Sequence, residues 1–215
     1  MSSFDLAANE TPRRYVAFLD ILGWSSHVLS DFESARGTYD SMLEFFRLGT
    51  DSFAGVDAVR IVSDSILVVA PKPWPLLRAV NVLHHATLIN DCLLRGGIAF
   101  GRHAELGQLP ESRIVSEPLI VAARLEKTIR HPCVAIDSSA LPEVDCKELL
   151  AADVFLRPLL FYEGRWIVKP FNIMWGFSAA TRVTQLREKY PEHTPKYDWF
   201  LRLYEAVKSR QPLVP

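Results

Sequence analysis

The alternation of apolar and polar positions predicts a mixed succession of strands and helices. Short runs rich in β-branched and aromatic residues are typical of strands, whereas apolar residues repeating about every 3.6 positions are typical of helices. These patterns predict strands over 13–20, 58–62, 66–70, 93–102 and 133–137, helices over about 25–48, 76–91, 118–130, 177–189 and 196–209, and a hairpin over 154–175. The order β, α, β–β, α, β, α, β is that of a ferredoxin-like βαββαβ sandwich, an α+β fold with helices on one face of a mostly antiparallel sheet.

Length and composition favour one domain. The chain has 215 residues, of which 49% are hydrophobic, enough to fill a single core. Residues 1–12 are polar and are expected to be loose, residues 13–176 would form the main domain, and residues 177–215 would be a helical extension of it.

Charge, apolar runs and cysteine content indicate the partners and the cellular location to expect. With 24 basic and 25 acidic side chains, the net charge of −1 lacks the basic footprint of a duplex-DNA-binding protein, so no nucleic-acid partner is expected. No apolar run is long enough to span a membrane, and the N-terminus lacks an apolar signal core. The three cysteines form no CxxC pair. A cytoplasmic protein without a membrane anchor is therefore expected.

Two acids interrupt the apolar pattern. Asp20 ends the first predicted strand, and Asp64 lies between Ser63 and Ser65 at the tip of the predicted hairpin over 58–70. The first strand of a ferredoxin-like sheet lies beside this hairpin, so both carboxylates are expected at one end of the sheet. Facing carboxylates repel unless a cation lies between them. Mg²⁺ prefers one or two carboxylates together with water and phosphate oxygens, so the pattern favours a nucleoside-triphosphate site.

The turn after Asp20 adds a place for phosphate. Gly23 and Trp24 put backbone N–H groups at the expected helix start, where an anion is favoured. The alternatives are purely structural: Asp20 caps the helix that follows, and Asp64 is an ordinary turn residue.

Four motifs in order resemble class III nucleotidyl cyclases. They are FLDILGW (18–24), VRIVSDSILVV (59–69), RGGIAFG (95–101) and SEPLIVAARLE (116–126), spanning about residues 13–137. The resemblance makes residues 13–176 a cyclase catalytic domain. The short length and the FLDILGW spelling look most like the pyrimidine cyclases of bacterial Pycsar antiphage systems.

The resemblance implies a reaction and a set of roles. The 3′-hydroxyl of a nucleoside triphosphate attacks its α-phosphorus, and pyrophosphate leaves. Two divalent ions, Mg²⁺ or Mn²⁺, would be bound at Asp20, Ile21 and Asp64. Arg124 matches the arginine that stabilises the transition state, contributed from the opposite subunit of a head-to-tail homodimer. Otherwise Arg124 is a surface residue paired with Glu126 or Glu117.

Two positions depart from the family pattern. Ile120 stands where the family usually has an asparagine that orients the ribose, which puts the rate in doubt more than the identity of the reaction. Lys169 falls roughly at the position of a triphosphate-binding lysine. The alternative for Lys169 is a solvated lysine at a strand end.

Base choice is expected to depend on Arg60 and Arg113, which align with the base-recognising positions. Arginine offers only donors, so it suits the two carbonyl oxygens of uracil better than the amino groups of adenine and cytosine. The alternative is that both arginines are solvated charges at strand edges.

The resulting functional hypothesis is a uridylate cyclase. It would convert UTP to 3′,5′-cyclic UMP, a second messenger acting on a cyclic-nucleotide effector in antiphage defence. The alternatives are a cytidylate cyclase, an ordinary adenylate or guanylate cyclase, and a non-catalytic nucleotide-binding domain.

Overall fold

The computed structural model describes residues 11–48, 53–106, 113–141, 153–154 and 156–215. The strands are β1 (Arg13–Leu22), β2 (Ala58–Val62), β3 (Ser65–Ala70), β4 (Leu93–Leu106), β5 (Arg113–Ser116), β6 (Val134–Ile136), β7 (Leu159–Tyr162) and β8 (Arg165–Val168). The helices are α1 (Trp24–Ser30), α2 (Phe32–Leu48), α3 (Pro73–Ile89), α4 (Glu117–Thr128), α6 (Gly176–Lys189) and α7 (Thr194–Lys208), with a 3₁₀ turn, η2 (Pro191–His193). None of the described helices is long and apolar enough to cross a bilayer.

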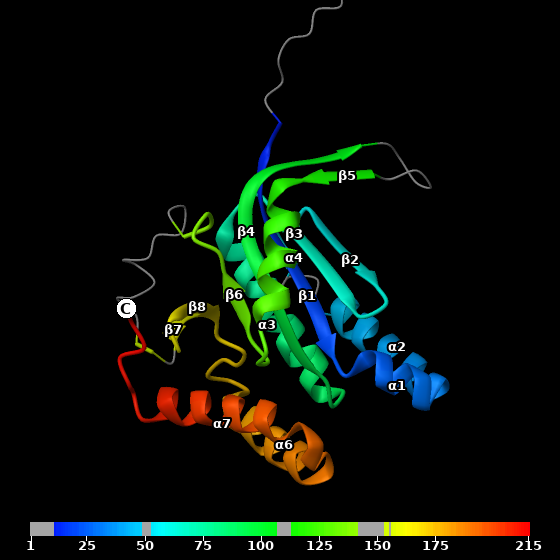
Figure 1. The fold of residues 1–215 in the computed structure, drawn as a ribbon, viewed down its shortest axis with the longest axis vertical. Helices are drawn as coiled ribbons and strands as arrows, with labels where there is room; N and C mark the ends of the chain where they lie inside the picture. Colours follow the sequence, from blue (N-terminus) through cyan, green and yellow to red (C-terminus); the bar gives the residue numbers. More distant parts are fainter. Residues whose placement is uncertain (1–10, 49–52, 107–112, 142–152, 155) are drawn as a thin grey trace, which may run out of the picture.

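One sheet organises the molecule (Figure 1). Its strands follow the order β2-β3-β1-β4-β6-β8-β7, and β5 pairs with the far part of β4. The β4–β6 pair is parallel and the other pairs are antiparallel. The α+β fold predicted from the sequence is confirmed, and so are the β2–β3 hairpin and the β7–β8 hairpin, which turns at Glu163 and Gly164.

Helices cover both faces of the sheet, so the expectation of helices on one face was wrong. Neighbouring residues on β1 separate into different cores: Ala17 packs with α1–α3 and the first core, whereas Val16 packs on the other face toward Leu119 of α4. Neighbouring Ile167 and Val168 on β8 separate in the same way. The core that contains Ile167 holds α6 and α7, so the C-terminal helices pack on the sheet itself.

Close packing of α4 depends on glycine in β4. A Cβ built on Gly97 would lie 2.4 Å from the carbonyl oxygen of Ala122, so any side chain there would collide with the α4 backbone. Figure 1 shows α4 in front of the sheet at this place. Gly97 therefore holds α4, which carries Arg124, directly against the strand beside β1.

Two boundaries differ from the sequence prediction. The helix expected over 25–48 is two helices, because Asp31 leaves the helical conformation (φ −152°, ψ 89°) and its carboxylate accepts from the N–H of Ser34 at 3.0 Å, capping α2. The loop expected after residue 102 is partly strand: β4 continues to Leu106, and β5 returns antiparallel to it. This extension carries His103 and Glu105.

The outer edge of the sheet at β7 is covered by the C-terminal segment. The backbone N–H of Phe161 donates to the carbonyl of Leu213 at 2.9 Å. A guanidinium N–H of Arg157 donates to the carbonyl of Pro212 at 3.2 Å. Of the loose N-terminus expected over residues 1–12, all but the last two residues lie outside the described part of the chain.

Candidate active site

The first strand and the hairpin turn bring Asp20 and Asp64 to one end of the sheet. Asp20 is level with Ser65 of β3 on one side and with Arg95 of β4 on the other. The backbone N–H of Ile21 donates to the carbonyl of Asp64 at 2.9 Å, which joins the hairpin turn directly to the end of β1. The hairpin itself is tight, since Val62 pairs with Ser65 and Ser63 takes a positive φ of 55°.

The electrostatics of Asp20 reflect this proximity. Burial raises the pKa of Asp20 above its usual 3.8, the Arg95 guanidinium lowers it, and the Asp64 carboxylate raises it again. The pKa is raised because of burial, since the attraction of Arg95 exceeds the repulsion between the two acids. A divalent cation bound between the carboxylates would relieve this repulsion, so these residues fit the metal that the sequence predicts. Among the described residues no cluster of three or more His, Cys, Asp or Glu side chains could hold a metal, so water and phosphate would complete the coordination.

Arg95 is a site residue that the sequence analysis did not assign. Its Nε lies 2.9 Å from Oδ2 of Asp20 and 2.7 Å from Oε1 of Glu126. Burial raises the pKa of Glu126 and Arg95 lowers it. The available signal was the arginine that opens RGGIAFG, one strand from Asp20. Arg95 thus ties β1, β4 and α4 together at the site.

The turn after β1 positions Asp64 from the other side. Gly23 has a φ of +84°, which side-chain-bearing residues rarely adopt, and it turns the chain into α1. The buried Trp24 begins that helix, and the hydroxyl of Ser25 donates to Oδ2 of Asp64 at 3.4 Å. The expected phosphate role of Gly23 and Trp24 stays a prediction.

Arg124 is exposed on α4, and its expected surface partners are bound by other arginines. Glu117 accepts from Nε of Arg102 at 2.9 Å, and Glu126 pairs with Arg95. Arg124 forms no ion pair in the described part of the chain. Ile120, one turn earlier, is 55% exposed. The exposed face of α4 therefore presents both positions away from this subunit's own core.

Of the expected base-recognising residues, Arg60 lies on the same face of the sheet as Asp20, two residue positions along the strands. Arg60 pairs in register with Leu67, and Leu67 with Phe18, two residues before Asp20 on β1. The Arg60 guanidinium forms an ion pair with Glu105 of β4. Arg113 is exposed at the start of β5 and pairs in register with Leu106, next to Glu105.

Lys169 is buried, which excludes the alternative of a solvated lysine at a strand end. It is 2% exposed, and its ammonium donates to the carbonyl of Val154 at 3.1 Å. It follows β8, three strands away from β1, and lines a cavity of about 520 Å³ formed largely by α3 and residues 156–158 and 171–173. The described contacts do not bring it to Asp20, and its phosphate-binding role stays a prediction.

Replacing Lys169 with methionine is expected to raise the free energy of unfolding at pH 7 by about 1–2 kcal/mol. Burial lowers the pKa of Lys169 from 10.5 to about 8, so at neutral pH the folded protein holds a charge that its surroundings disfavour. Between pH 8 and 10.5 the folded lysine loses its proton while the unfolded one keeps it, so the wild type gains stability as the pH rises through this window. Urea unfolding at pH 7 and 10 measures this gain.

Lys72→Met at the exposed start of α3 is the matched control, and it should follow the wild-type pH profile. A K169M profile parallel to that of the wild type between pH 8 and 10 would contradict the assignment.

Comparison with known proteins supports the architecture. No protein-family model matches the chain, and no curated protein matches it in sequence. An adenylate cyclase from Trypanosoma brucei, in its monomeric state, matches with a TM-score of 0.55 and 13% identity, over 74% of this chain and 89% of that one. The chain has the class III cyclase fold.

Other solved structures agree with this cyclase fold. The guanylyl cyclase Cya2 matches with a TM-score of 0.50 and 16% identity, over 75% of this chain and 93% of that one. The monomeric guanylyl cyclase domain of the RhoGC fusion protein from Blastocladiella emersonii matches with a TM-score of 0.50 and 20% identity, over 74% and 95%. At these identities the likeness concerns the fold, and the activity has to be argued from the chain's own residues.

Proposed function

We propose that this chain is a nucleotidyl cyclase that converts UTP to 3′,5′-cyclic UMP and pyrophosphate. The observation that carries the proposal is the meeting of Asp20 and Asp64, joined through the Ile21 N–H, at one end of a class III cyclase fold. Two carboxylates beside a Gly23 turn suit a metal-bound triphosphate.

The chemistry is an intramolecular displacement. The ribose 3′-oxygen forms a bond to the α-phosphorus, the bond from that phosphorus to the β-phosphate oxygen breaks, and the hydroxyl proton passes to solvent. Bound divalent ions would activate the hydroxyl and neutralise the triphosphate. Asp20 and Asp64 would hold these ions, with the Ile21 backbone as a further metal-binding position. Arg124 would neutralise charge that develops on the α-phosphate.

A homodimer would complete the site. Arg124 is exposed on α4 and would contact a nucleotide bound to a second copy of the chain. Arg95, in contrast, forms ion pairs with Asp20 and Glu126 of its own chain. The preference for UTP rests on Arg60 and Arg113, whose donors suit the carbonyl oxygens of uracil. The short length and the FLDILGW spelling, which look most like antiphage pyrimidine cyclases, support a role for the product as a second messenger for a defence effector.

A panel of nucleotides tests the proposal. Purified protein is incubated separately with UTP, CTP, ATP and GTP, with Mn²⁺ or Mg²⁺, and the products are identified by chromatography and mass spectrometry. Cyclic UMP is the expected main product. Cyclic AMP as the main product would contradict the base assignment, and the absence of every cyclic product would contradict the cyclase assignment.

One observation favours a second candidate, a cyclase-like domain that binds a nucleotide without turnover. Ile120 cannot form the hydrogen bond to ribose that an asparagine provides at this position in the family. Nucleotide binding measured by calorimetry, together with no product under any metal, would support this candidate.

A further inference from the structure

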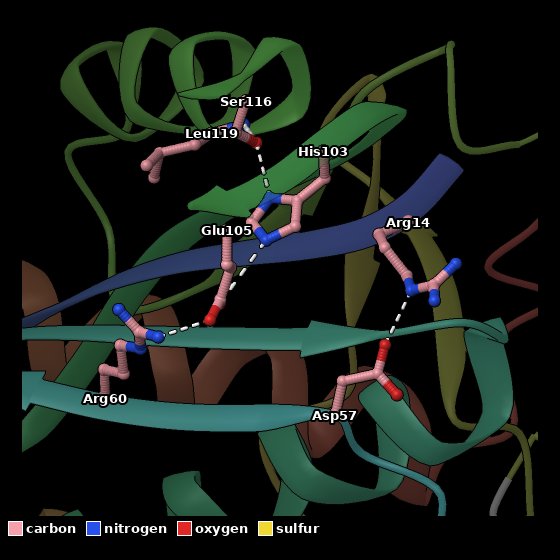
Figure 2. Close-up of polar contacts among 7 residues, drawn as sticks. All are labelled: Arg14, Asp57, Arg60, His103, Glu105, Ser116 and Leu119. Atoms are coloured by element: carbon pink, nitrogen blue, oxygen red, sulfur yellow. Dashed lines mark hydrogen bonds and ion pairs between the residues drawn. The ribbon is translucent and has the colours of Figure 1, made fainter. Parts of the chain in front are cut away.

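A second polar cluster lies on the β4–β5 extension, apart from the two acids (Figure 2). Arg60 of β2 and Glu105 of β4 form an ion pair, and their side chains remain 35% and 33% exposed. Glu105 also lies 3.5 Å from Nε2 of His103, measured from its Oε1. The carboxylate is therefore held between a guanidinium and an imidazole.

The hydrogen bonds around His103 orient its ring toward Glu105. The Ser116 hydroxyl oxygen accepts from the N–H of Leu119 at 3.2 Å and lies 2.9 Å from Nδ1 of His103. That hydroxyl can donate its own hydrogen to Nδ1, and in that tautomer the ring proton is on Nε2. Nε2 is buried, has no hydrogen-bond partner within the described residues, and faces the Glu105 carboxylate (Figure 2). The buried His103 ring therefore lies against the Glu105 carboxylate and limits its orientation.

There is room for a ligand beside this carboxylate. His103, Ala104 and Glu105 line a cavity of about 270 Å³ that extends to the Arg14–Asp57 ion pair, and Arg60 is connected to it through its ion pair with Glu105. Pockets for drug-sized ligands measure about 300–1,000 Å³, so this space suits a single ring better than a whole nucleotide.

We propose that Glu105 is a specificity-determining residue, and that Arg60 and Glu105 together select a base that carries a carbonyl next to a ring N–H. This inference rests on the proposed function and deepens it, because it assigns an acceptor to a subsite for which the sequence indicated only donors. His103 is the positioning residue that holds the acceptor in place.

The four bases differ in the hydrogen-bonding groups that they would present to Arg60 and Glu105. Uracil presents O4 as an acceptor for Arg60 and N3–H as a donor to Glu105. Cytosine reverses both groups, with an amino group facing the guanidinium and a bare N3 facing the carboxylate. Adenine misfits in the same way. Guanine has the same carbonyl and N–H edge as uracil, so ring size has to separate these two.

Glu105→Gln tests the acceptor. A glutamine amide can present either its oxygen or its NH₂ group, so it accepts both the uracil edge and the cytosine edge. The ratio of kcat/KM for UTP to that for CTP is expected to fall about tenfold or more, because one unpaired buried group no longer penalises cytosine. Glu105→Ala should lower the same ratio, and the melting temperature of each variant checks folding.

Glu33→Gln is the matched control, since Glu33 forms an exposed ion pair with Arg36 on α2 and its variant should keep the wild-type ratio. An unchanged ratio in both Glu105 variants would overturn the inference while leaving the cyclase intact. So would a wild-type preference for CTP or ATP, or an equal loss of selectivity in the control.

A binding measurement tests the inference separately if the proposed cyclase activity is absent. If the wild type forms no cyclic product, the dissociation constants of UTP and CTP replace kcat/KM, and the same change in their ratio is expected. Equal affinity of the wild type for UTP and CTP, or no binding of either, would overturn the inference.

Discussion

Replacing Asp64 with asparagine is expected to lower cyclic-nucleotide formation at least about a hundredfold, measured as kcat with Mn²⁺ and the preferred nucleotide. Asparagine keeps the size of the side chain but lacks the negative charge that would bind a divalent cation. Asp64 is a cleaner choice than Asp20, because Asp20 also pairs with Arg95, whereas the described side-chain contact of Asp64 is the 3.4 Å hydrogen bond from Ser25. The backbone bond from Ile21 is unaffected by the change.

The melting temperature should therefore stay close to that of the wild type, which separates lost catalysis from lost folding. Asp40→Asn on the exposed surface of α2 removes one acid without touching the site, and its activity should be unchanged. If Asp64→Asn keeps more than half of the wild-type activity, the metal assignment is wrong.

Arg124→Ala alone is expected to form cyclic nucleotide about a hundredfold or more slowly than the wild type. Mixing it with Asp64→Asn is expected to restore activity. Each mixed dimer would contain one site that lacks both groups and one site that is complete. With equal amounts and free exchange of subunits, half of the dimers are mixed, so activity should return to about a quarter of the wild-type value. The measurement is initial rate against mixing ratio.

The recovery distinguishes a shared site from a site within one chain. Mixing Asp64→Asn with Asp20→Asn supplies the matched control. Both acids of a site come from the same chain, so every site in this mixture lacks one acid and no activity should return. No recovery with Arg124→Ala, together with a dimer seen by light scattering, would show that Arg124 does not act across the interface.

The parts of the fold that depend on local sequence, the hairpins and their turns, could be predicted. The hairpin at Asp64 and the turn at Gly164 were visible in the alternation of apolar residues and turn formers, and the structure confirms both. The break at Asp31 was missed because the apolar spacing continues across it, although an aspartate three residues before Ser34 is a capping signal. Helices on both faces were missed because strand periodicity alone does not say which helix covers which side.

The site followed from the sequence only in part. Asp20 and Asp64 could be placed together because strand order brings β1 beside the hairpin. Arg95 was missed although RGGIAFG places it on the strand beside Asp20, and Glu105 was missed because a loop was expected where β4 continues to Leu106. The burial of Lys169 was in neither interpretation of the sequence, since a lysine beside a proline gives no sign that the ammonium will be enclosed and bound to the Val154 carbonyl.

The segment that covers β7 has a practical consequence for handling the protein. An uncovered edge strand is a template for pairing between molecules, and here the Leu213 carbonyl accepts from Phe161 of that edge while the Pro212 carbonyl accepts from Arg157 just before β7. A bulky partner fused close to Leu213 is expected to disturb this hydrogen bond and favour aggregation during purification. A long flexible spacer before any such tag keeps the edge closed.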